Sequence, residues 1–325
     1  MKAVVYDHYG PPDVLRLEEV PKPEPASDEI LVKVRAAAVN RLDVHTREAN
    51  ASNGPWISLV SRLVFGIRGP RQRIIGSEYS GEVEQVGSAV REFTPGDRVF
   101  GVSGLRFGAN AEYVTVRERS RVARKPLNAT FEEAAGIADG FLNAIGCLRQ
   151  AGLRPGSDVL VFGASGSIGT AGVQLASHRR AHVTAVCQAK DFDLVRTLGA
   201  RELVDYTQED FTKSGKKYDV IFDAVGKLSF AHCKASLNPD GWYLPTDGAI
   251  NALLVPLTRL AGTKRVGASW GSTTPQQDLA LLRQLVEAGQ YHPVIDRVYG
   301  MNEVVEATRY VESQQKVGNV VLTIP

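Results

Sequence analysis

The sequence predicts an α/β protein in which a β-rich N-terminal domain is followed by a domain built on a parallel sheet. Three observations predict this fold class. Short strands separated by turn-forming segments fill roughly the first 120 positions. Helical stretches then alternate with short apolar strands, which indicates βαβ units. The length of 325 residues suits two domains better than one.

The expected strands of the first domain mix β-branched and charged residues at short spacing. They are Lys2–Tyr6, Glu29–Ala37, Gly81–Val86, Arg98–Phe100 and Glu112–Val116. Turns such as Thr94-Pro95-Gly96-Asp97 separate them, because proline and glycine favour turns. The pattern predicts a β-barrel-like domain. Its least regular part is Ala49–Arg73, which contains Gly, Pro, Arg and Trp and which we expect to be a mobile loop.

Beyond about residue 124 the pattern becomes that of alternating helices and strands. The expected helices are Thr130–Gly152, Ser167–His178, Phe192–Gly199, Thr274–Gly289 and one that begins at Asn302. The expected strands are Val159–Phe162, His182–Cys187, Val220–Asp223, Tyr243–Pro245, Arg265–Ser269, Val294–Tyr299 and Val320–Ile324. The last strand is similar to those of the first domain, so the C-terminal segment is expected to complete it. The expected domains are therefore 1–123 with 271–325, and 124–270.

The composition indicates a soluble, cytoplasmic protein. Lys and Arg number 38 and Asp and Glu 36, and the resulting net charge of +2 predicts neither a nucleic-acid partner nor a membrane partner. The first ten residues carry charge, and the apolar runs are too short to span a bilayer. The three cysteines are scattered without a CxxC pair, which is typical of reduced thiols.

The strongest chemical signal is a glycine-rich loop between an apolar strand that ends at Phe162 and the helix that follows. Glycine lets a backbone turn sharply and approach a pyrophosphate, and a helix N-terminus offers N–H groups and a positive dipole end. The spacing is GxxGxxG rather than GxGxxG, so the motif depends on its strand–loop–helix context. A tight turn without a ligand is the alternative. We expect dinucleotide binding, with these cofactor-binding residues in the loop: Gly163, Ser165, Gly166, Ser167, Ile168 and Gly169.

The end of the next strand predicts the choice of cofactor. Enzymes that use NAD place Asp or Glu there to bind the adenosine ribose, whereas this strand ends at Cys187 without a carboxylate. The space beside Cys187 and the charge of Lys190 suit a 2′-phosphate, so NADPH is the expected cofactor. Asp191 is a complication, and capping the helix that follows is its expected role.

Several segments, taken in order, carry a family resemblance. They are Ala36–Asp43, Gly76–Gly87, Phe93–Gly101, Gly163–Gly169, Asp219–Gly226 and Lys316–Ile324. Over nearly its whole length the chain resembles the zinc-free quinone oxidoreductases of the medium-chain dehydrogenase/reductase superfamily. The resemblance implies a GroES-like catalytic domain, a Rossmann cofactor domain and a cleft between them.

The resemblance also implies further cofactor contacts. Tyr206 matches a tyrosine near the adenosine phosphate, Val225 and Gly226 match the turn beside the nicotinamide ribose, and Asn319 lies where the C-terminal tail reaches the cofactor. The alternatives are a strand-end aromatic for Tyr206 and a plain strand end for the residues around Val225.

Zinc-containing members of the superfamily hold catalytic zinc with Cys, His and Cys. The resemblance matches these positions to Asn40, Ser77 and, by rough alignment, Asp139, and the following glutamate to Glu78. Zinc prefers thiolate and imidazole ligands, so we expect no metal.

A metal-free site favours reduction of an electron-poor acceptor, since alcohol oxidation needs help in removing a proton. The expected function is NADPH-dependent hydride transfer to quinones. The alternatives are an enone or enoyl reductase and, less favoured, a non-catalytic NADPH-binding or RNA-binding protein. Asn40 is the candidate hydrogen-bond donor to the acceptor oxygen, with a structural loop role as the alternative. His45 is a weaker candidate general acid, because the reference pKa of histidine lies near neutrality, and a surface or packing histidine is the favoured alternative.

A homodimer is expected through the Rossmann domain. The apolar stretch Ala249–Leu260 precedes Lys264–Trp270, which reads as the last strand of the parallel sheet. The outer edge of such a strand has unpaired N–H and C=O groups that a twofold mate would pair. The alternative is an edge covered by the local helix.

Overall fold

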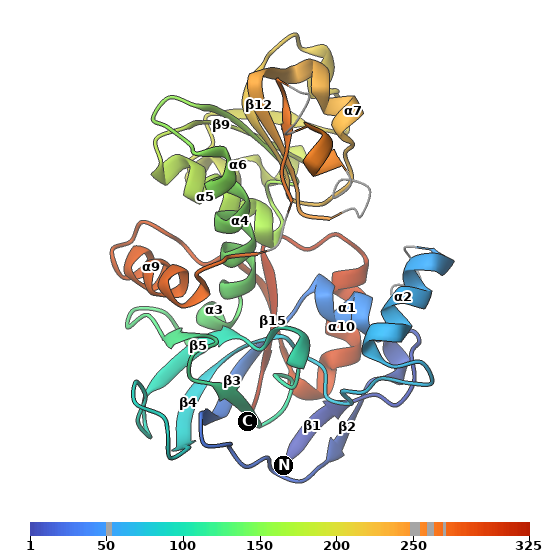
Figure 1. The fold of residues 1–325 in the computed structure, drawn as a ribbon, viewed down its shortest axis with the longest axis vertical. Helices are drawn as coiled ribbons and strands as arrows, with labels where there is room; N and C mark the ends of the chain where they lie inside the picture. The colour runs from blue at the N-terminus through green and yellow to red at the C-terminus, as the bar shows by residue number, and fades with distance from the viewer. Residues whose placement is uncertain (50–53, 248–253, 259–262, 269–270) are drawn as a thin grey trace. The chain divides into compact units, whose positions relative to one another are not determined.

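The computed structural model describes residues 1–49, 54–247, 254–258, 263–268 and 271–325 (Figure 1). The chain divides into two compact units, each considered by itself below. The first comprises Met1–Ala138, Pro275–Gly289 and Pro293–Pro325, and the second comprises Asp139–Thr274 and Gln290–His292. The α/β class predicted from the sequence is confirmed.

The first unit is built on a mostly antiparallel sheet with the strand order β14-β15-β3-β4-β5-β7, and β6 pairs with β3. A separate antiparallel pair is formed by β1 (Lys2–Val5) and β2 (Arg16–Glu19). The strands of the main sheet are β3 (Glu29–Val39), β4 (Glu78–Val86), β5 (Arg98–Val102), β6 (Tyr113–Arg117), β7 (Arg121–Arg124), β14 (Ile295–Gly300) and β15 (Asn319–Thr323). Val320 of β15 pairs with Val39 of β3, so the C-terminal strand is part of this sheet.

Helices of the first unit cover and connect this sheet. They are η1 (Pro12–Val14), α1 (Arg41–Arg47), α2 (Pro55–Phe65), η3 (Gly104–Arg106), α3 (Phe131–Ala135), α9 (Pro275–Glu287), η7 (Met301–Glu303) and α10 (Val304–Glu312). The core packs alternate residues of the strands, among them Val32, Tyr79 and Leu322, all fully buried.

The loop expected at Ala49–Arg73 is wrong for much of its length, because α2 is an eleven-residue helix within it. Pro55 at its first position was a usable signal, since the fixed φ of proline favours the first turn of a helix. Most residues of the helix are apolar, and its few polar residues, Ser58, Ser61 and Arg62, give only a weak signal of a surface helix.

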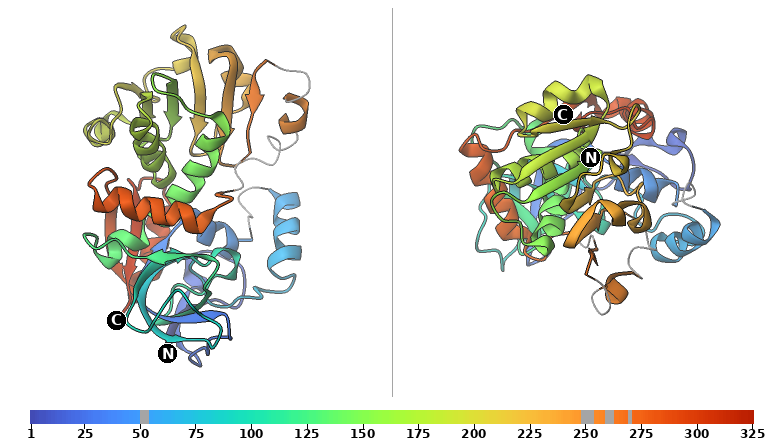
Figure 2. Two further views of the ribbon diagram at one scale, coloured as in Figure 1. Left: turned by 60° about the vertical axis from the view of Figure 1, so that its left-hand side comes forward. Right: turned by 90° about the horizontal axis from the view of Figure 1, so that it is seen from above.

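The second unit has a parallel sheet with the order β10-β9-β8-β11-β12-β13, which is the strand order of a doubly wound dinucleotide-binding fold. Its strands are β8 (Asp158–Phe162), β9 (His182–Cys187), β10 (Glu202–Asp205), β11 (Tyr218–Asp223), β12 (Leu237–Pro245) and β13 (Arg265–Val266). Figure 2 shows helices on both faces of this sheet. These helices include α4 (Ala138–Ala151), α5 (Ser167–His178), η4 (Ala189–Asp191), α6 (Phe192–Thr197), η5 (Phe211–Lys213), α7 (Phe230–Cys233) and η6 (Lys234–Ser236).

Two differences from the expected organisation concern the connection between the units. The single helix predicted at Thr130–Gly152 is split into α3 and α4, with Gly136 at the break. A Cβ on Gly136 would lie 2.8 Å from Ile295 and 3.0 Å from Asn319, so the chain passes close to β14 and β15 there. Because α3 packs on β3 and β4, residues 124–138 belong with the first unit rather than with the second.

Candidate functional site

The glycine-rich loop joins β8 to α5 in the second unit. Gly163 has φ +75°, and a Cβ there would lie 2.0 Å from Val225, so only glycine fits. A Cβ on Gly169 would lie 2.0 Å from the Gly163 carbonyl oxygen, which explains the third glycine by close packing. Gly166 has ordinary φ, and a Cβ there would meet only the Gly163 oxygen at 3.5 Å. The protein itself does not require glycine at 166, so the open space above it suits a ligand.

The N-terminus of α5 opens at this loop. Gly166 is its N-cap residue and provides no side-chain cap, and the first bond of the helix runs from Thr170 N–H to the Gly166 carbonyl at 2.8 Å. The N–H groups of the first turn, which include those of Ser167 and Ile168, have no helical acceptors by geometry. Ser165, Gly166, Ser167 and Ile168 are all half-buried. These residues therefore form a cradle of the kind that binds a pyrophosphate.

The turn after β11 is organised by Asp223, a residue that the sequence analysis did not single out. Its carboxylate, fully buried, accepts hydrogen bonds from the backbone N–H of Val225 at 3.2 Å and of Gly226 at 2.8 Å. It also accepts one from the Tyr243 hydroxyl at 3.1 Å. Gly226 has φ +71°, and a Cβ on it would lie 2.4 Å from Asp247. Contacts within the protein therefore fix this turn beside Gly163, and they do not depend on a ligand.

The end of β9 lies beside the end of β10, where Asp205 pairs with Cys187 in the parallel register. Burial, followed by the charges of Asp191 and Asp205, raises the pKa of the Cys187 thiol to about 12. The Asp205 carboxylate accepts from Thr207 N–H at 2.9 Å and from Ala189 N–H at 3.3 Å. Hydrogen bonds from Thr207 hold the pKa of Asp205 below its usual value. The sequence analysis missed this carboxylate because it comes from the neighbouring strand.

Two further predicted cofactor residues lie at the same strand ends. Lys190, in η4, is exposed. Tyr206 is 49% exposed, and its hydroxyl accepts a hydrogen bond from Gln188 Nε2 at 3.0 Å. The Tyr206 ring lies 6.2 Å from that of Phe162, the last residue of β8. An exposed aromatic ring and an amide therefore meet where an adenosine 2′-phosphate is expected, and Lys190 is exposed in η4, two residues after Gln188.

Asn40 is the N-cap residue of α1 in the first unit. Its side-chain oxygen accepts from Asp43 N–H at 3.2 Å, and the Asp43 carboxylate accepts from Asn40 N–H at 3.0 Å, a reciprocal capping box. The side-chain amide of Asn40 donates to Ser77 Oγ at 2.8 Å. The structural role considered for Asn40 is present, and Asp43 takes part in the same capping box. An amide nitrogen carries two hydrogens, and Ser77 accepts one of them.

His45 lies on α1, one turn after Arg41. Its Nε2 accepts from Arg41 Nε at 3.1 Å, and its Nδ1 lies 3.3 Å from Glu48 Oε1. Because Nε2 accepts from Arg41, Nδ1 is the ring nitrogen that faces the Glu48 carboxylate. Both ring nitrogens are therefore engaged within the first unit.

Lys316 is a charged residue of the first unit, and no role was predicted for it from the sequence beyond its place in the segment Lys316–Ile324. The residue as a whole is half-buried, and its ammonium group donates to the Gly318 carbonyl at 2.6 Å. Burial lowers the pKa of Lys316 to about 8, although the charges of Asp296 and Glu78 raise it. Glu78 is fully buried next to Ser77. Lys316, whose charge interacts with that of Glu78, lies more than 200 residues later in the chain, so no local sequence pattern predicts their proximity.

Asn319 begins β15 in the first unit. Its backbone N–H donates to the Val294 carbonyl at 2.9 Å, and its side-chain amide donates to the same carbonyl at 3.1 Å. These bonds hold β15 beside the residues that precede β14. The cofactor contact of Asn319 remains a prediction.

The residues at the zinc positions of the superfamily do not fit zinc. The first two positions, Asn40 and Ser77, supply an amide and a hydroxyl that bond to each other, whereas zinc prefers thiolate and imidazole. Within the described ranges, no group of three or more His, Cys, Asp or Glu side chains is arranged to hold a metal ion. The third position, Asp139, lies in the first turn of α4 in the second unit.

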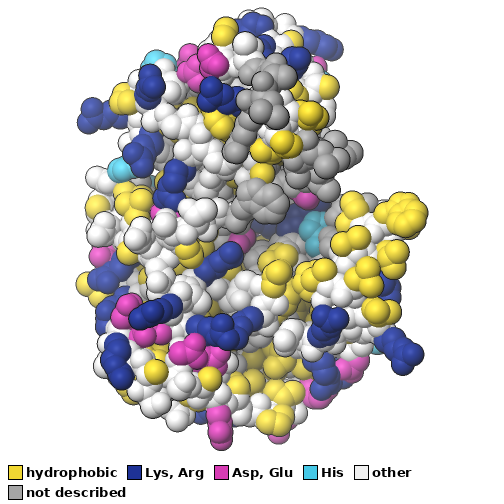
Figure 3. All heavy atoms as spheres, in the orientation of Figure 1, with side chains coloured by type: hydrophobic (Ala, Val, Ile, Leu, Met, Phe, Trp, Pro, Cys, Tyr) yellow, Lys and Arg dark blue, Asp and Glu magenta, His cyan; other side chains and the backbone are white. Residues whose placement is uncertain are grey.

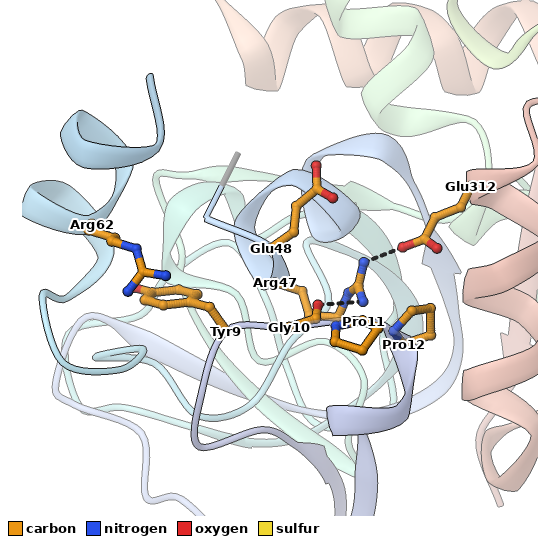
Figure 4. Close-up of a pocket in the computed structure, with 8 residues that line it drawn as sticks. All are labelled: Tyr9, Gly10, Pro11, Pro12, Arg47, Glu48, Arg62 and Glu312. Carbon is orange, nitrogen blue, oxygen red and sulfur yellow. Dashed lines mark hydrogen bonds and ion pairs between the residues drawn. The ribbon is translucent and has the colours of Figure 1, made fainter. Parts of the chain in front are cut away.

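A hollow of about 400 Å³ opens in the first unit, and no predicted site residue lines it, although Glu48 in its wall contacts His45 (Figure 4). Arg47, buried in its wall, donates to the Gly10 carbonyl at 2.8 Å and pairs with Glu312. The guanidinium of Arg62, from α2, lies 4.9 Å from the centre of the Tyr9 ring. The charged group of Arg47 is already paired, so the hollow presents an ion pair rather than a vacant charge.

The described residues also bear on membrane insertion. None of their helices combines the length and apolar character needed to cross a bilayer.

Comparison with known proteins places the chain in a family. Residues 26–126 match the alcohol dehydrogenase GroES-like domain, and residues 198–322 match the zinc-binding dehydrogenase family. The chain is 32% identical to the NADPH-dependent alkenal/one oxidoreductase, chloroplastic, of Arabidopsis thaliana over 99% of this chain and 79% of the relative. It is also 32% identical to quinone-oxidoreductase QR1, chloroplastic, of Triphysaria versicolor, over 94% of this chain and 93% of the relative.

A solved structure agrees with these relatives. The quinone oxidoreductase from Coxiella burnetii superposes with a TM-score of 0.87 at 26% identity, covering 100% of this chain and 99% of the other. Sequence and fold therefore agree over the whole length, and the chain belongs to the zinc-free quinone oxidoreductase branch of the medium-chain dehydrogenase/reductase superfamily.

Proposed function

We propose that the protein is an NADPH-dependent reductase that passes a hydride to an electron-poor acceptor, with quinones as the preferred class. The observation that carries the proposal is the cradle, in which Gly163 and Gly169 are required by contacts within the protein whereas Gly166 leaves open space at the start of α5. Relatives named for NADPH-dependent alkenal/one reduction and for quinone reduction support the same class of reaction.

The residues that would hold NADPH belong to the strand ends of the second unit. The first-turn N–H groups of α5 bind the pyrophosphate, and Lys190 pairs with the 2′-phosphate beside Tyr206. The turn at Val225 and Gly226 receives the nicotinamide ribose, and Asn319 contacts the cofactor from the C-terminal tail. When bound, NADPH supplies the hydride.

In the first unit, the second amide hydrogen of Asn40 is the proposed donor to the acceptor oxygen, where negative charge develops during reduction. Ser77 fixes the orientation of that amide by accepting its other hydrogen. His45 remains the weaker candidate, as a general acid. The reaction is proposed to run without a metal. A cytoplasmic location and a homodimer belong to the same proposal.

Steady-state NADPH oxidation with three acceptor classes tests this function. Naphthoquinones should turn over with a higher kcat/KM than small enones or α,β-unsaturated thioesters. A clear preference for an enone or a thioester would instead assign the protein to the enone or enoyl reductases. Tight NADPH binding without turnover of any acceptor would favour the non-catalytic alternative.

A further inference from the structure

Helix α2 turns its polar side toward the protein. Ser61 is buried, and the guanidinium of Arg62 lies over the ring of Tyr9. Phe65 meets the edge of Phe107 at 6.1 Å between ring centres. The burial of Ser61 and these two contacts fix one side of the helix on the first unit. The helix is therefore attached through the side that a surface helix normally presents to water.

The opposite side of α2 is apolar and exposed. The exposed residues of α2 and the turn after it are Trp56 (79%), Ile57 (44%), Leu59 (50%), Val60 (59%), Leu63 (54%), Val64 (51%) and Ile67 (64%). At 3.6 residues per turn, those on the helix occupy one continuous arc of about 160°. Figure 3 shows hydrophobic side chains gathered over α2. Contiguous apolar surface of this kind is uncommon on a monomeric soluble protein and marks an interaction site.

The charge around this surface identifies the chemistry of its partner. Residues 49–76 contain four arginines, at 62, 68, 71 and 73, and neither Asp nor Glu. Arg73 is neutralised by Asp7 and Glu18. Arg71 donates to the Val64 carbonyl at 3.1 Å, so its charge lies at the C-terminal end of α2. The apolar arc is thus bordered by positive charge without a carboxylate in the same segment.

An apolar face bordered by arginines is complementary to an acidic phospholipid surface. Its apolar side chains enter the boundary between headgroups and acyl chains, tryptophan favours that boundary, and arginines pair with lipid phosphates. A second copy of the chain would bring like charges together and fits less well. We propose that α2, with residues 67–73, binds the surface of an acidic phospholipid bilayer. This inference is independent of the reductase activity.

The proposal revises an expectation that rested on the charge of the whole chain. The net charge of +2 predicted no membrane partner, but a net charge averages over the whole chain and does not show that Arg68 and Arg71 lie in a segment without Asp or Glu. Attraction to a membrane surface depends on charge within about a Debye length of it, so the local segment decides.

Co-sedimentation with vesicles tests the proposal directly. The protein should sediment with phosphatidylcholine vesicles that contain phosphatidylglycerol, and much less with phosphatidylcholine alone, and added salt should weaken binding. The double substitution Val60→Ser and Leu63→Ser should weaken it by roughly tenfold or more. The matched control is Leu127→Ser, which changes an exposed leucine outside α2 (85% exposed) and should bind as the wild type does.

A charge pair of variants tests the basic border. Arg68→Gln combined with Arg71→Gln should weaken binding by roughly tenfold at low salt, whereas Arg154→Gln combined with Arg201→Gln, both exposed elsewhere, should leave it unchanged. Circular dichroism and thermal unfolding verify that each variant is folded. On vesicle addition, tryptophan emission should shift to the blue in the wild type but not in Trp56→Phe.

Three results would overturn the proposal. The first is absence of sedimentation with acidic vesicles. The second is equal loss in the control variants. The third is a combination of two observations: the wild type does not bind lipid, and the Val60 and Leu63 double variant has a lower molecular mass than the wild type. That combination would assign the apolar face of α2 to contact with a second copy of the chain.

Discussion

The side-chain amide of Asn40 donates a hydrogen bond to Ser77 Oγ at 2.8 Å, while its oxygen accepts from Asp43 N–H at 3.2 Å. Asn40 and Ser77 occupy the positions that correspond to two zinc ligands in the metal-containing branch of the superfamily. Here they bond to each other, and Asn40 also starts α1. Hydrogen bonds among Asn40, Ser77 and Asp43 therefore hold these positions together, where the metal-containing branch has a zinc ion.

Asn40→Ser separates the two roles of this residue. Serine caps a helix about as well as asparagine, so the free energy of unfolding should fall by only about 1 kcal/mol, from loss of the bond to Ser77. The kcat/KM for quinone should fall by about tenfold to a hundredfold, because the amide donor to the acceptor oxygen is gone. Urea denaturation and steady-state kinetics measure the two effects. Unchanged kcat/KM would leave Asn40 as a helix cap alone.

Lys190→Ala should raise the KM for NADPH and barely change that for NADH. The contact is an exposed charge pair with the 2′-phosphate, so a loss of about 1–2 kcal/mol is expected, which is roughly a tenfold rise in KM. Lys213→Ala, also exposed in the second unit, is the matched control. Equal or better kinetics of the wild type with NADH would refute the assignment of Lys190.

Metal removal should leave quinone reduction unchanged. Asn40 and Ser77 supply an amide and a hydroxyl rather than thiolate or imidazole, so elemental analysis should find zinc well below one atom per chain. Activity should be the same before and after dialysis against a chelator. One tightly bound zinc per chain, lost together with activity, would contradict the metal-free mechanism.

Lys316 should make stability depend on pH above neutrality. Its pKa of about 8 in the folded protein lies below the ordinary value of 10.5. Between these values the unfolded chain binds a proton that the folded chain does not, so stability rises with pH; below the lower value the cost of the buried charge is fully present. Lys316→Met should therefore gain stability relative to the wild type at about pH 7 and lose that advantage by about pH 10.

Urea denaturation of both proteins at the two pH values measures this effect. A stability difference between variant and wild type that is the same at both pH values would show that Lys316 titrates normally.

The proposed homodimer should have twice the chain mass of 35.2 kDa in light scattering. In the described part of the sheet, β13 is the edge strand. The N–H of Val266 donates to Thr258 Oγ1 at 3.1 Å, the local cover that the sequence left open as the alternative. Of the predicted contact stretch Ala249–Leu260, residues 249–253 and 259–260 lie outside the described residues.

Two substitutions distinguish pairing across the edge from local cover. Val266→Pro removes the donor and should give a folded monomer, whereas Thr258→Val removes only the local acceptor and should stay dimeric. A wild-type mass near that of one chain would refute the dimer. Monomers from both variants would attribute the effect to the helix at 254–258 rather than to strand pairing.

The sequence by itself determined the features that depend on local backbone geometry. The predicted strand at His182–Cys187 and helix at Ser167–His178 match β9 and α5, because apolar spacing and glycine placement report directly on strand, turn and helix. The loop from Gly163 to Gly169 was identified for the same reason. The positive φ of Gly163 and the contact of Gly169 with the Gly163 carbonyl both arise within the loop, whereas the contact of Gly163 with Val225 does not.

Only the tertiary structure decided which distant residues meet. Strand order places Asp205 of β10 beside Cys187, and the C-terminal strand carries Lys316 toward Glu78. The orientation of α2 was likewise undetermined, because its polar side packs on the protein, which is the reverse of what a surface helix predicts. Contacts between residues far apart in the chain determine how strands pair and how a helix packs. The spacing of apolar residues in the local sequence does not predict these contacts.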